Sequence, residues 1–374
     1  MPSPPRILSI AFQRASENLD KSLIDDVGIA NSIEYICRNV QNRAGTRLLM
    51  ASLLAKIHRP EVDIRKPYTE IGDNDTYSGR TYDESYVSTF INQHDLPCNP
   101  TTAFLTPAFR NRNIVLTPDV NLVGRPPKLY QTVLQLLDHV YMGRVSPDDL
   151  LAETVRHLLI VRNEGQQQIT SLRADLKTSE ESVPLSSEAI VSLIQQHLAS
   201  PRSSRLPVLV VAAAYQCASD HLSERVLPLE SHTSADEQTG ALGDVQITLI
   251  GDDAVATAYE MKTRRVTQED INRALQKLST SGLRIDNYIF ITTDEIDQRV
   301  QEYAKGIYDE TGGIEVVILD CIGFLRHFLH LFHRIRTNYL EAYQNLVLDE
   351  PHSAVSQSLK VAFLALRRAA ESGE

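Results

Sequence analysis

Hydrophobic residues recur at helical spacing in two stretches of the first half of the chain. The first stretch runs from about Ser16 to His58 and contains a second helix that ends before Pro60. The second runs from about Pro127 to Gln166, and Ser146-Pro147 followed by two aspartates forms a good helix start within it. Both patterns predict a helical scaffold. The apolar positions are Leu23, Val27, Ala30, Ile33, Ile36 and Val40 in the first stretch, and Leu129, Val133, Leu136, Leu137 and Val140 in the second.

Helices alternate with short apolar runs in the second half of the chain. Two short strands joined by a Gly-Asp-Asp turn are expected within residues 241–262, and Thr267 with Asp270 is close to a capping box for the next helix. This order predicts an α/β (α+β) protein with a mixed central sheet flanked by helices. The other predicted elements are helices over 187–199, 206–225, 297–310 and 321–346, and buried strands over 288–292 and 314–319.

Residues 63–113 lose this periodicity and become rich in Gly, Asp, Asn, Pro, Thr, Tyr and Arg. An irregular segment of this length is unusual in a domain unless it has a function. Arginine and asparagine supply donors for base edges, and tyrosine supplies hydroxyls and flat faces. Two interpretations stay open: a DNA-recognition or substrate-organising region, or a loop-rich packing segment or dimer contact. The candidate DNA contacts are Arg65, Tyr77, Arg80, Arg110, Arg112 and Asn113.

The polar run QQQITSLRADLKTSEESVPLSS predicts a domain boundary near Glu180. It divides the chain into a largely helical and loop-rich N-terminal domain, residues 1–180, and a second domain, residues 181–374. The first domain is expected to serve DNA recognition or dimerisation.

The overall composition is that of an ordinary soluble protein, with 42% hydrophobic and 23% charged residues. The sequence has no apolar run long enough for a membrane span and no secretory signal pattern at its N-terminus. Its four scattered cysteines include no C-x-x-C pair, which suits a reducing compartment, so we expect a cytoplasmic protein. The net charge of −11 does not exclude DNA binding, because binding depends on where positive charge collects.

The segment ALGDVQITLIGDDAVATAYEMKTRR carries the residues best suited to catalysis. Side chains alternate along a strand, so Glu260 and Lys262 point the same way and Met261 points into the core. A hairpin brings Asp244 beside them. Two carboxylates can hold a hard divalent cation, and a lysine steadies a negative charge or a nucleophilic water. The alternative is a solvated strand edge with a Glu–Lys pair.

The order of Asp244, a gap, and Glu260-Met261-Lys262 resembles the PD-(D/E)xK nuclease superfamily, with Gly243 where proline is usual. The string EMKTRRVTQEDINRAL resembles the catalytic strand and following helix of type II restriction endonucleases. DIRKPYTEIGDNDTYSGRTYDESYV and LPCNPTTAFLTPAFRNRN resemble the SacI group of these enzymes. The resemblance implies a PD-(D/E)xK core and Mg²⁺-dependent cleavage of double-stranded DNA at a short specific site, leaving 5′-phosphate and 3′-hydroxyl ends.

The resemblance also implies roles for particular residues. Asp244, Glu260 and the main-chain carbonyl of Met261 are expected to bind Mg²⁺, while Lys262 orients or deprotonates the attacking water. Second candidates for the catalytic site are Gln246, on the strand face of Asp244, and Glu224, whose alternative is a solvated helix end. The candidate phosphate contacts after the strand are Arg264, Arg265 and Gln268.

A type II enzyme cutting a two-fold symmetric site is expected to be a homodimer, with a DNA methyltransferase as its functional partner. Two alternatives remain: a nuclease specific for modified or branched DNA, and an inactive DNA-binding protein with a nuclease fold. The intact Asp244, Glu260 and Lys262 argue against the last. His327, His330 and His333 drift by about 60° per step around a helix, so we interpret their helix as a packing or dimer element, not a metal site.

Overall fold

The computed structural model describes residues 2–40, 42–99, 101–110, 113–177, 184–229, 241–252, 254–282 and 285–372. The chain divides into two units, one formed by residues 1–168 with 351–353 and the other by residues 169–350 with 354–374. The division falls between Gln168 and Ile169, inside helix α7 (Pro147–Lys177), whereas the sequence predicted a boundary near Glu180. No local pattern in the sequence predicts that residues 351–353 belong to the first unit.

The first unit is helical and is built around α3 (Ala44–His58). Every residue of α3 from Ala44 to Ala55 is buried, so this helix is enclosed on all sides. The predicted helix start near Ser16 is wrong, because the chain is not helical between Glu17 and Val27. Asp26 begins the next helix instead, by accepting hydrogen bonds from the N–H groups of Gly28 and Ile29. The helices that contact α3 are α1 (Pro4–Glu17), α2 (Val27–Arg38) and α6 (Pro127–Tyr141), and the first part of α7 contributes to the same apolar cluster.

The polar segment 63–113 uses many of its polar groups inside the first unit. Asp83 is fully buried, pairs with Arg47 and also accepts hydrogen bonds from the Thr102 hydroxyl and the Ala103 N–H. Tyr77 is buried as well, and its hydroxyl donates to the Ile64 carbonyl at 2.7 Å. These contacts make the segment a packed part of the fold. Its short helical turns are η1 (Thr69–Ile71), α4 (Gly79–Tyr82), η2 (Asp83–Val87), α5 (Ser88–Gln93) and η3 (Ala103–Leu105).

The second unit contains a mixed sheet whose five described strands follow the order β1-β2-β3-β4-β5. The strands β1, β2 and β3 pair antiparallel, and β3, β4 and β5 pair parallel. The predicted hairpin and buried strands are therefore present, and the fold is of the mixed α/β class. The strands are β1 (Glu224–Val226), β2 (Val245–Leu249), β3 (Val255–Lys262), β4 (Asn287–Thr292) and β5 (Glu315–Asp320).

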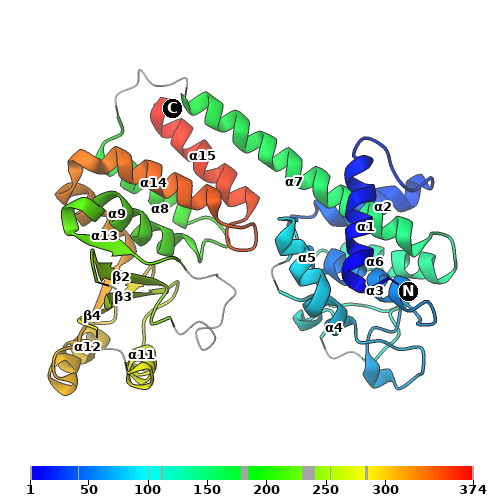
Figure 1. Cartoon of the computed structure of the whole chain (residues 1–374), viewed down its shortest axis with the longest axis horizontal. Coiled ribbons are helices and arrows are strands. Elements are labelled where there is room, and N and C mark those ends of the chain that lie inside the picture. The colour runs from blue at the N-terminus through cyan, green and yellow to red at the C-terminus, as the bar shows by residue number, and fades with distance from the viewer. Residues whose placement is uncertain are drawn as a thin grey trace. The chain divides into compact units, whose positions relative to one another are not determined.

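Helices cover both faces of this sheet (Figure 1). One apolar cluster joins one face to α8, α9, α13, α14 and α15, and a second joins the other face to α11 and α12. Tyr259 belongs to the first cluster and Ala258 to the second, as alternation along β3 requires. The helices are α8 (Ser187–Leu198), α9 (Leu206–Leu222), α11 (Gln268–Ser281), α12 (Gln298–Thr311), α13 (Cys321–Leu331), α14 (Arg336–Asp349) and α15 (Gln357–Ser372).

Two predicted helices differ from the structure. The helix expected over 206–225 ends at Leu222, because Ser223 takes a left-handed conformation (φ 55°) and Glu224 starts β1. The long helix expected over 321–346 breaks at η4 (His333–Ile335), because Phe332 leaves the helical conformation and packs its ring on Phe328. Within the part of the chain that the structure describes, no helix is both long enough and apolar enough to cross a membrane.

Candidate active site

The strand register brings Asp244 to the end of the hairpin that carries Glu260. Val245 of β2 pairs with Tyr259 of β3 in an antiparallel ladder, so the residue before Val245 lies at the end of β3 where Glu260 follows Tyr259. Glu260 lies on the face that α11 and α12 cover, and Asp244 lies at the same end of the hairpin, directly before the first paired residue of β2.

A hydrogen bond fixes the Asp244 carboxylate to the end of β3. Its Oδ2 atom accepts the main-chain N–H of Met261 at 2.7 Å. The next carbonyl, that of Lys262, accepts the N–H of Thr293, so it points toward β4. Main-chain groups alternate sides along a strand, and the N–H and C=O of one residue point the same way. The Met261 carbonyl is thus directed to the side on which Asp244 lies.

Glu260 and Lys262 form an ion pair on that face, as their spacing predicts. The Lys262 Nζ atom donates to Glu260 Oε1 at 2.8 Å, and the side chains are 22% and 17% exposed. The other carboxylate oxygen, Oε2, accepts a hydrogen bond from the Tyr288 hydroxyl at 3.3 Å. The pair is held from the protein side and still reached by solvent, which a site acting on an external substrate requires. The Met261 side chain packs partly buried in the cluster on the opposite face.

Gly243 makes the approach of the Asp244 segment to β3 possible. A Cβ atom at this position would lie 2.5 Å from the Tyr259 carbonyl oxygen, closer than real Cβ contacts allow. Proline also carries a Cβ atom, so this backbone does not accept the residue that is usual in the resembled motif. The departure noted in the sequence has a steric reason in this fold.

Gln246 and Glu224 differ in their relation to the acidic pair. Gln246 lies on the same strand face as Asp244 by alternation, and its Oε1 atom accepts the Leu242 N–H at 3.3 Å, which closes the turn before β2. Glu224 shares its face with Val226, which belongs to the cluster on the α9 side. The structure therefore places Glu224 on the opposite face from Glu260, against the expectation that it joins the site.

The surroundings of Glu224 are apolar and aromatic. Burial raises the pKa of the Glu224 carboxyl, and its charge in turn contributes to raising the pKa values of Tyr215 and Tyr259, for which burial is the main cause. The hydroxyls of these two tyrosines hydrogen-bond at 2.7 Å. Tyr215 belongs to α9, so this group lies on the face of the sheet that α9 covers.

The candidate phosphate contacts lie at the corner between β3 and α11. Arg264 binds both oxygens of Asp270 at 2.7 and 2.8 Å, and Asp270 completes the predicted capping box with Thr267. Arg265 pairs with Glu295 and, at 3.8 Å, with Asp294. Both arginine side chains are more than half exposed, and Gln268 is exposed at the first position of α11.

The candidate DNA contacts of the first unit fall into two groups. Tyr77 is buried, and Arg65 is held by Asp63, by Asp138 and over the Tyr141 ring, so both stabilise the fold. For Tyr77 the expectation of a DNA contact is wrong, because the core encloses its ring. Arg80, Arg110 and Asn113 are exposed, whereas Arg112 lies outside the described residues.

Tyr288 and Leu242 border the site without having been predicted there. The sequence placed Tyr288 in a buried strand and gave it no role. The sequence signal for such a role is a tyrosine within an apolar run, because a buried tyrosine hydroxyl needs a hydrogen-bond partner. Which partner it meets depends on the pairing of β3 with β4.

The donors of this site fit a hard cation such as Mg²⁺. Asp244 and Glu260 would supply carboxylate oxygens and Met261 a carbonyl, and Mg²⁺ is commonly bound by one or two carboxylates with water and substrate phosphate completing its shell. Among the described residues no group of three or more His, Cys, Asp and Glu side chains could hold a metal by itself, so substrate or water would have to complete this site.

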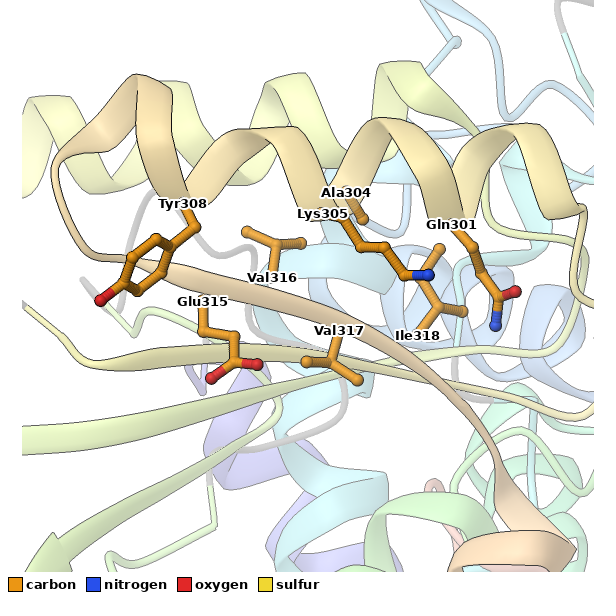
Figure 2. A pocket seen from close by; sticks show the side chains of 8 residues that line it. All are labelled: Gln301, Ala304, Lys305, Tyr308, Glu315, Val316, Val317 and Ile318. Atoms are coloured by element: carbon orange, nitrogen blue, oxygen red, sulfur yellow. The ribbon is translucent and has the colours of Figure 1, made fainter.

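The described residues also form a cavity of about 610 Å³ between α12 and β5 (Figure 2). Gln301, Lys305 and Tyr308 of α12 line it together with Glu315 of β5. None of its lining residues belongs to the acidic site at the end of β3. This cavity is therefore separate from the acidic site.

The second unit is thus a mixed α/β fold that presents two carboxylates and a lysine at the end of a strand. Residues 182–293 match the family model described as SacI restriction endonuclease C-terminal domain. The matched range, less than a third of the chain, contains Asp244, Glu260 and Lys262, and it excludes the N-terminal strings that also resemble the SacI group. The match supports a SacI-like restriction endonuclease, a family that implies a site-specific, DNA-binding nuclease. No curated protein was found to match the chain.

Proposed function

We propose that the chain is a type II restriction endonuclease whose second unit cuts DNA with Mg²⁺ at Asp244, Glu260 and Lys262. The observation that carries the proposal is the hydrogen bond from the Met261 N–H to Asp244, which ties this carboxylate to the strand end where Lys262 lies 2.8 Å from the Glu260 carboxylate. The family match over this segment supports DNA as the substrate. The proposal includes a PD-(D/E)xK core and products with 5′-phosphate and 3′-hydroxyl ends.

Each residue has a distinct part in the proposed reaction. Asp244 and Glu260, with the Met261 carbonyl, bind the cation. When bound, Mg²⁺ polarises the scissile phosphate and lowers the pKa of a water molecule. Lys262 places its ammonium group beside the carboxylates, where it orients the attacking water and balances the charge that develops on the phosphate.

The proposal extends to assembly and cellular context. Two copies of the chain give two sites related by a two-fold axis, which is the symmetry of a palindromic DNA sequence. We propose a homodimer for this reason, acting in the cytoplasm beside a methyltransferase that protects host DNA. The proposal does not require a stable complex between the endonuclease dimer and the methyltransferase.

The test is a digest of unmethylated phage DNA with and without Mg²⁺. Wild-type protein is expected to give discrete bands only with the metal, and sequencing of the fragment ends identifies the target and the cut positions. Asp244→Asn, Glu260→Gln and Lys262→Ala should abolish the bands. Matched controls are Glu302→Gln and Lys305→Ala, two exposed residues of α12, which should cut like wild type.

The outcomes separate the alternatives. Absence of cleavage of unmodified DNA, followed by cleavage of methylated or branched DNA, would replace the restriction proposal with the alternative substrate. Cleavage by the three active-site variants at wild-type rate would show that the site lies elsewhere. Binding without cleavage of any substrate would identify an inactive DNA-binding protein.

A further inference from the structure

Tyr288 reaches the candidate active site from the neighbouring strand β4. Its hydroxyl lies 3.0 Å from the Leu242 carbonyl oxygen and 3.3 Å from Glu260 Oε2. Leu242 precedes Asp244 by two residues. One buried hydroxyl therefore contacts both the segment that carries Asp244 and the carboxylate of Glu260.

We propose that Tyr288 is a positioning residue that sets the orientation of the Glu260 carboxylate and its spacing from Asp244 for cation binding. The proposal rests on the function proposed above and adds a residue to it. Tyr288 does not contact the reacting atoms; it acts through Glu260 and through the turn before β2.

The two donors to Glu260 come from different directions. Lys262 donates to Oε1 from the same strand, and Tyr288 donates toward Oε2 from β4. A carboxylate held at both oxygens has already lost rotation about its last side-chain bond. Binding a cation therefore costs less conformational entropy of the Glu260 side chain. The Lys262 ammonium group sits on a flexible four-carbon stem, whereas the phenol of Tyr288 is rigid.

The ring of Tyr288 is itself immobilised by the sheet and by α11 and α12. The residue is 1% exposed, pairs in register with Ala258, and packs against Phe290 with ring centroids 5.2 Å apart. Ala258 lies on the same face two residues before Glu260 and leaves room beside the ring, since its side chain is a single methyl group. The hydroxyl is thus a fixed reference point for the flexible carboxylate.

The hydroxyl also stabilises the turn that presents Asp244. The Leu242 carbonyl accepts from Tyr288, and the Leu242 N–H donates to Gln246 Oε1 at 3.3 Å. Both main-chain groups of Leu242 are therefore bound by side chains of the sheet. A single hydroxyl proton is shared between Leu242 and Glu260, so the two contacts respond together when Glu260 binds a cation.

The test is Tyr288→Phe in the full chain, with Tyr259→Phe as the matched control. Tyr259 is also a buried sheet tyrosine with one hydroxyl hydrogen bond, to Tyr215, but it lies on the opposite face. Mg²⁺ binding is measured by calorimetry without DNA, and the Mg²⁺ midpoint of cleavage is measured at saturating DNA. Tyr288→Phe should raise the Mg²⁺ dissociation constant and the Mg²⁺ midpoint of cleavage by about 10-fold each. Tyr259→Phe should change neither value. At saturating Mg²⁺ the cleavage rate of Tyr288→Phe should return toward that of wild type.

Thermal unfolding of both variants separates a loss of stability from a loss of metal affinity. An unchanged Mg²⁺ affinity in a folded Tyr288→Phe protein, or an equal loss of affinity in Tyr259→Phe, would overturn the positioning role. The proposed function would still stand if the wild-type protein cuts DNA with Mg²⁺. If wild type neither binds nor needs Mg²⁺, the proposed function and this inference both fail.

Wild-type protein labelled at the tyrosine Cζ carbon gives a second measurement, independent of whether Tyr288→Phe folds. Mg²⁺ should then shift one buried tyrosine resonance in wild type and leave it unshifted in Glu260→Gln. A spectrum in which Mg²⁺ moves no buried tyrosine resonance would overturn the inference.

Discussion

The Asp244 carboxylate accepts the main-chain N–H of Met261 at 2.7 Å, across a separation of seventeen residues. The contact ties the segment before β2 to the strand that carries Glu260 and Lys262. It replaces a main-chain partner that β2 would otherwise supply, because the ladder between β2 and β3 begins only at Val245. The position of Asp244 is therefore built into the end of the hairpin.

Gly243→Ala should reduce cleavage and stability together. The added Cβ atom would lie 2.5 Å from the Tyr259 carbonyl oxygen, so the segment must move. We expect a destabilisation of about 1–3 kcal/mol and, because a displacement near 1 Å at a catalytic group is costly, a loss in cleavage rate of about 100-fold. Unfolding in urea and the rate of plasmid cleavage measure the two effects.

Gly306→Ala is the matched control for that substitution. Gly306 lies within α12, and a Cβ atom there meets nothing within 4 Å. Alanine should stabilise this helix by about 0.5–1 kcal/mol and leave cleavage unchanged. Wild-type cleavage by Gly243→Ala would contradict the steric reason given for this glycine.

Glu224→Gln should retain metal-dependent cleavage, because Glu224 lies on the face of the sheet opposite Glu260. Glu260→Gln removes a proposed cation ligand, and the several kcal/mol of transition-state stabilisation that the cation supplies depend on it. The cleavage rate of Glu260→Gln should therefore fall by at least about 100-fold. Glu224→Gln should stay within about 3-fold of wild type by the same scale. Cleavage rates across a Mg²⁺ titration give the comparison, and equal losses would return Glu224 to the active site.

Asp270→Asn should destabilise the second unit in a pH-dependent way. Although burial opposes it, hydrogen bonds from Arg264 and Thr267 lower the pKa of Asp270 from 3.8 to about 2. A carboxyl with a lowered pKa contributes stability above its unfolded value, and this contribution is lost as pH falls through the folded value. The difference between wild type and Asp270→Asn should be on the order of 2 kcal/mol at pH 7 and should shrink between about pH 4 and pH 2.

Urea unfolding across this pH range measures the Asp270 effect. Asp309→Asn, an exposed residue of α12, serves as the control and should shift the unfolding midpoint little at any pH. A wild-type advantage that persists undiminished at pH 2 would show that the Asp270 contacts do not depend on its charge.

Arg265→Ala should lower DNA affinity and reduce its salt dependence. The Arg265 side chain is 57% exposed and its acidic partners lie on the surface, so a phosphate can replace them. Losing one phosphate contact should reduce the slope of log affinity against log salt concentration by about one. Fluorescence anisotropy with Ca²⁺ in place of Mg²⁺ measures binding without relying on cleavage.

Arg273→Ala is the control for the salt slope, since Arg273 pairs with Glu269 on the exposed face of α11. An equal change of slope in both variants would mean that Arg265 contributes only to general charge. Arg264→Ala should act mainly on stability, because Arg264 binds both oxygens of Asp270.

Local patterns in the sequence determined the hairpin, the capping box at Thr267 and the alternation of helices and strands in the second unit. They also placed Glu260 and Lys262 on one face, because the side-chain period of a strand is set by its own backbone. The sequence predicted the ends of helices less well than their presence. Apolar spacing continues across the non-helical residues before Val27. Neither the left-handed residue Ser223 nor the helix break at Phe332 has a strong local signal in the sequence.

Tertiary structure alone decided which of the predicted residues meet. The face occupied by Glu224 depends on the pairing of β1 with β2, and the partner of Tyr288 depends on the pairing of β3 with β4. The burial of Tyr77 and the clearance required at Gly243 depend on atoms distant in the sequence in the same way. A strand pattern specifies alternation between two faces, but only the contacts between strands and helices determine which face becomes the active site.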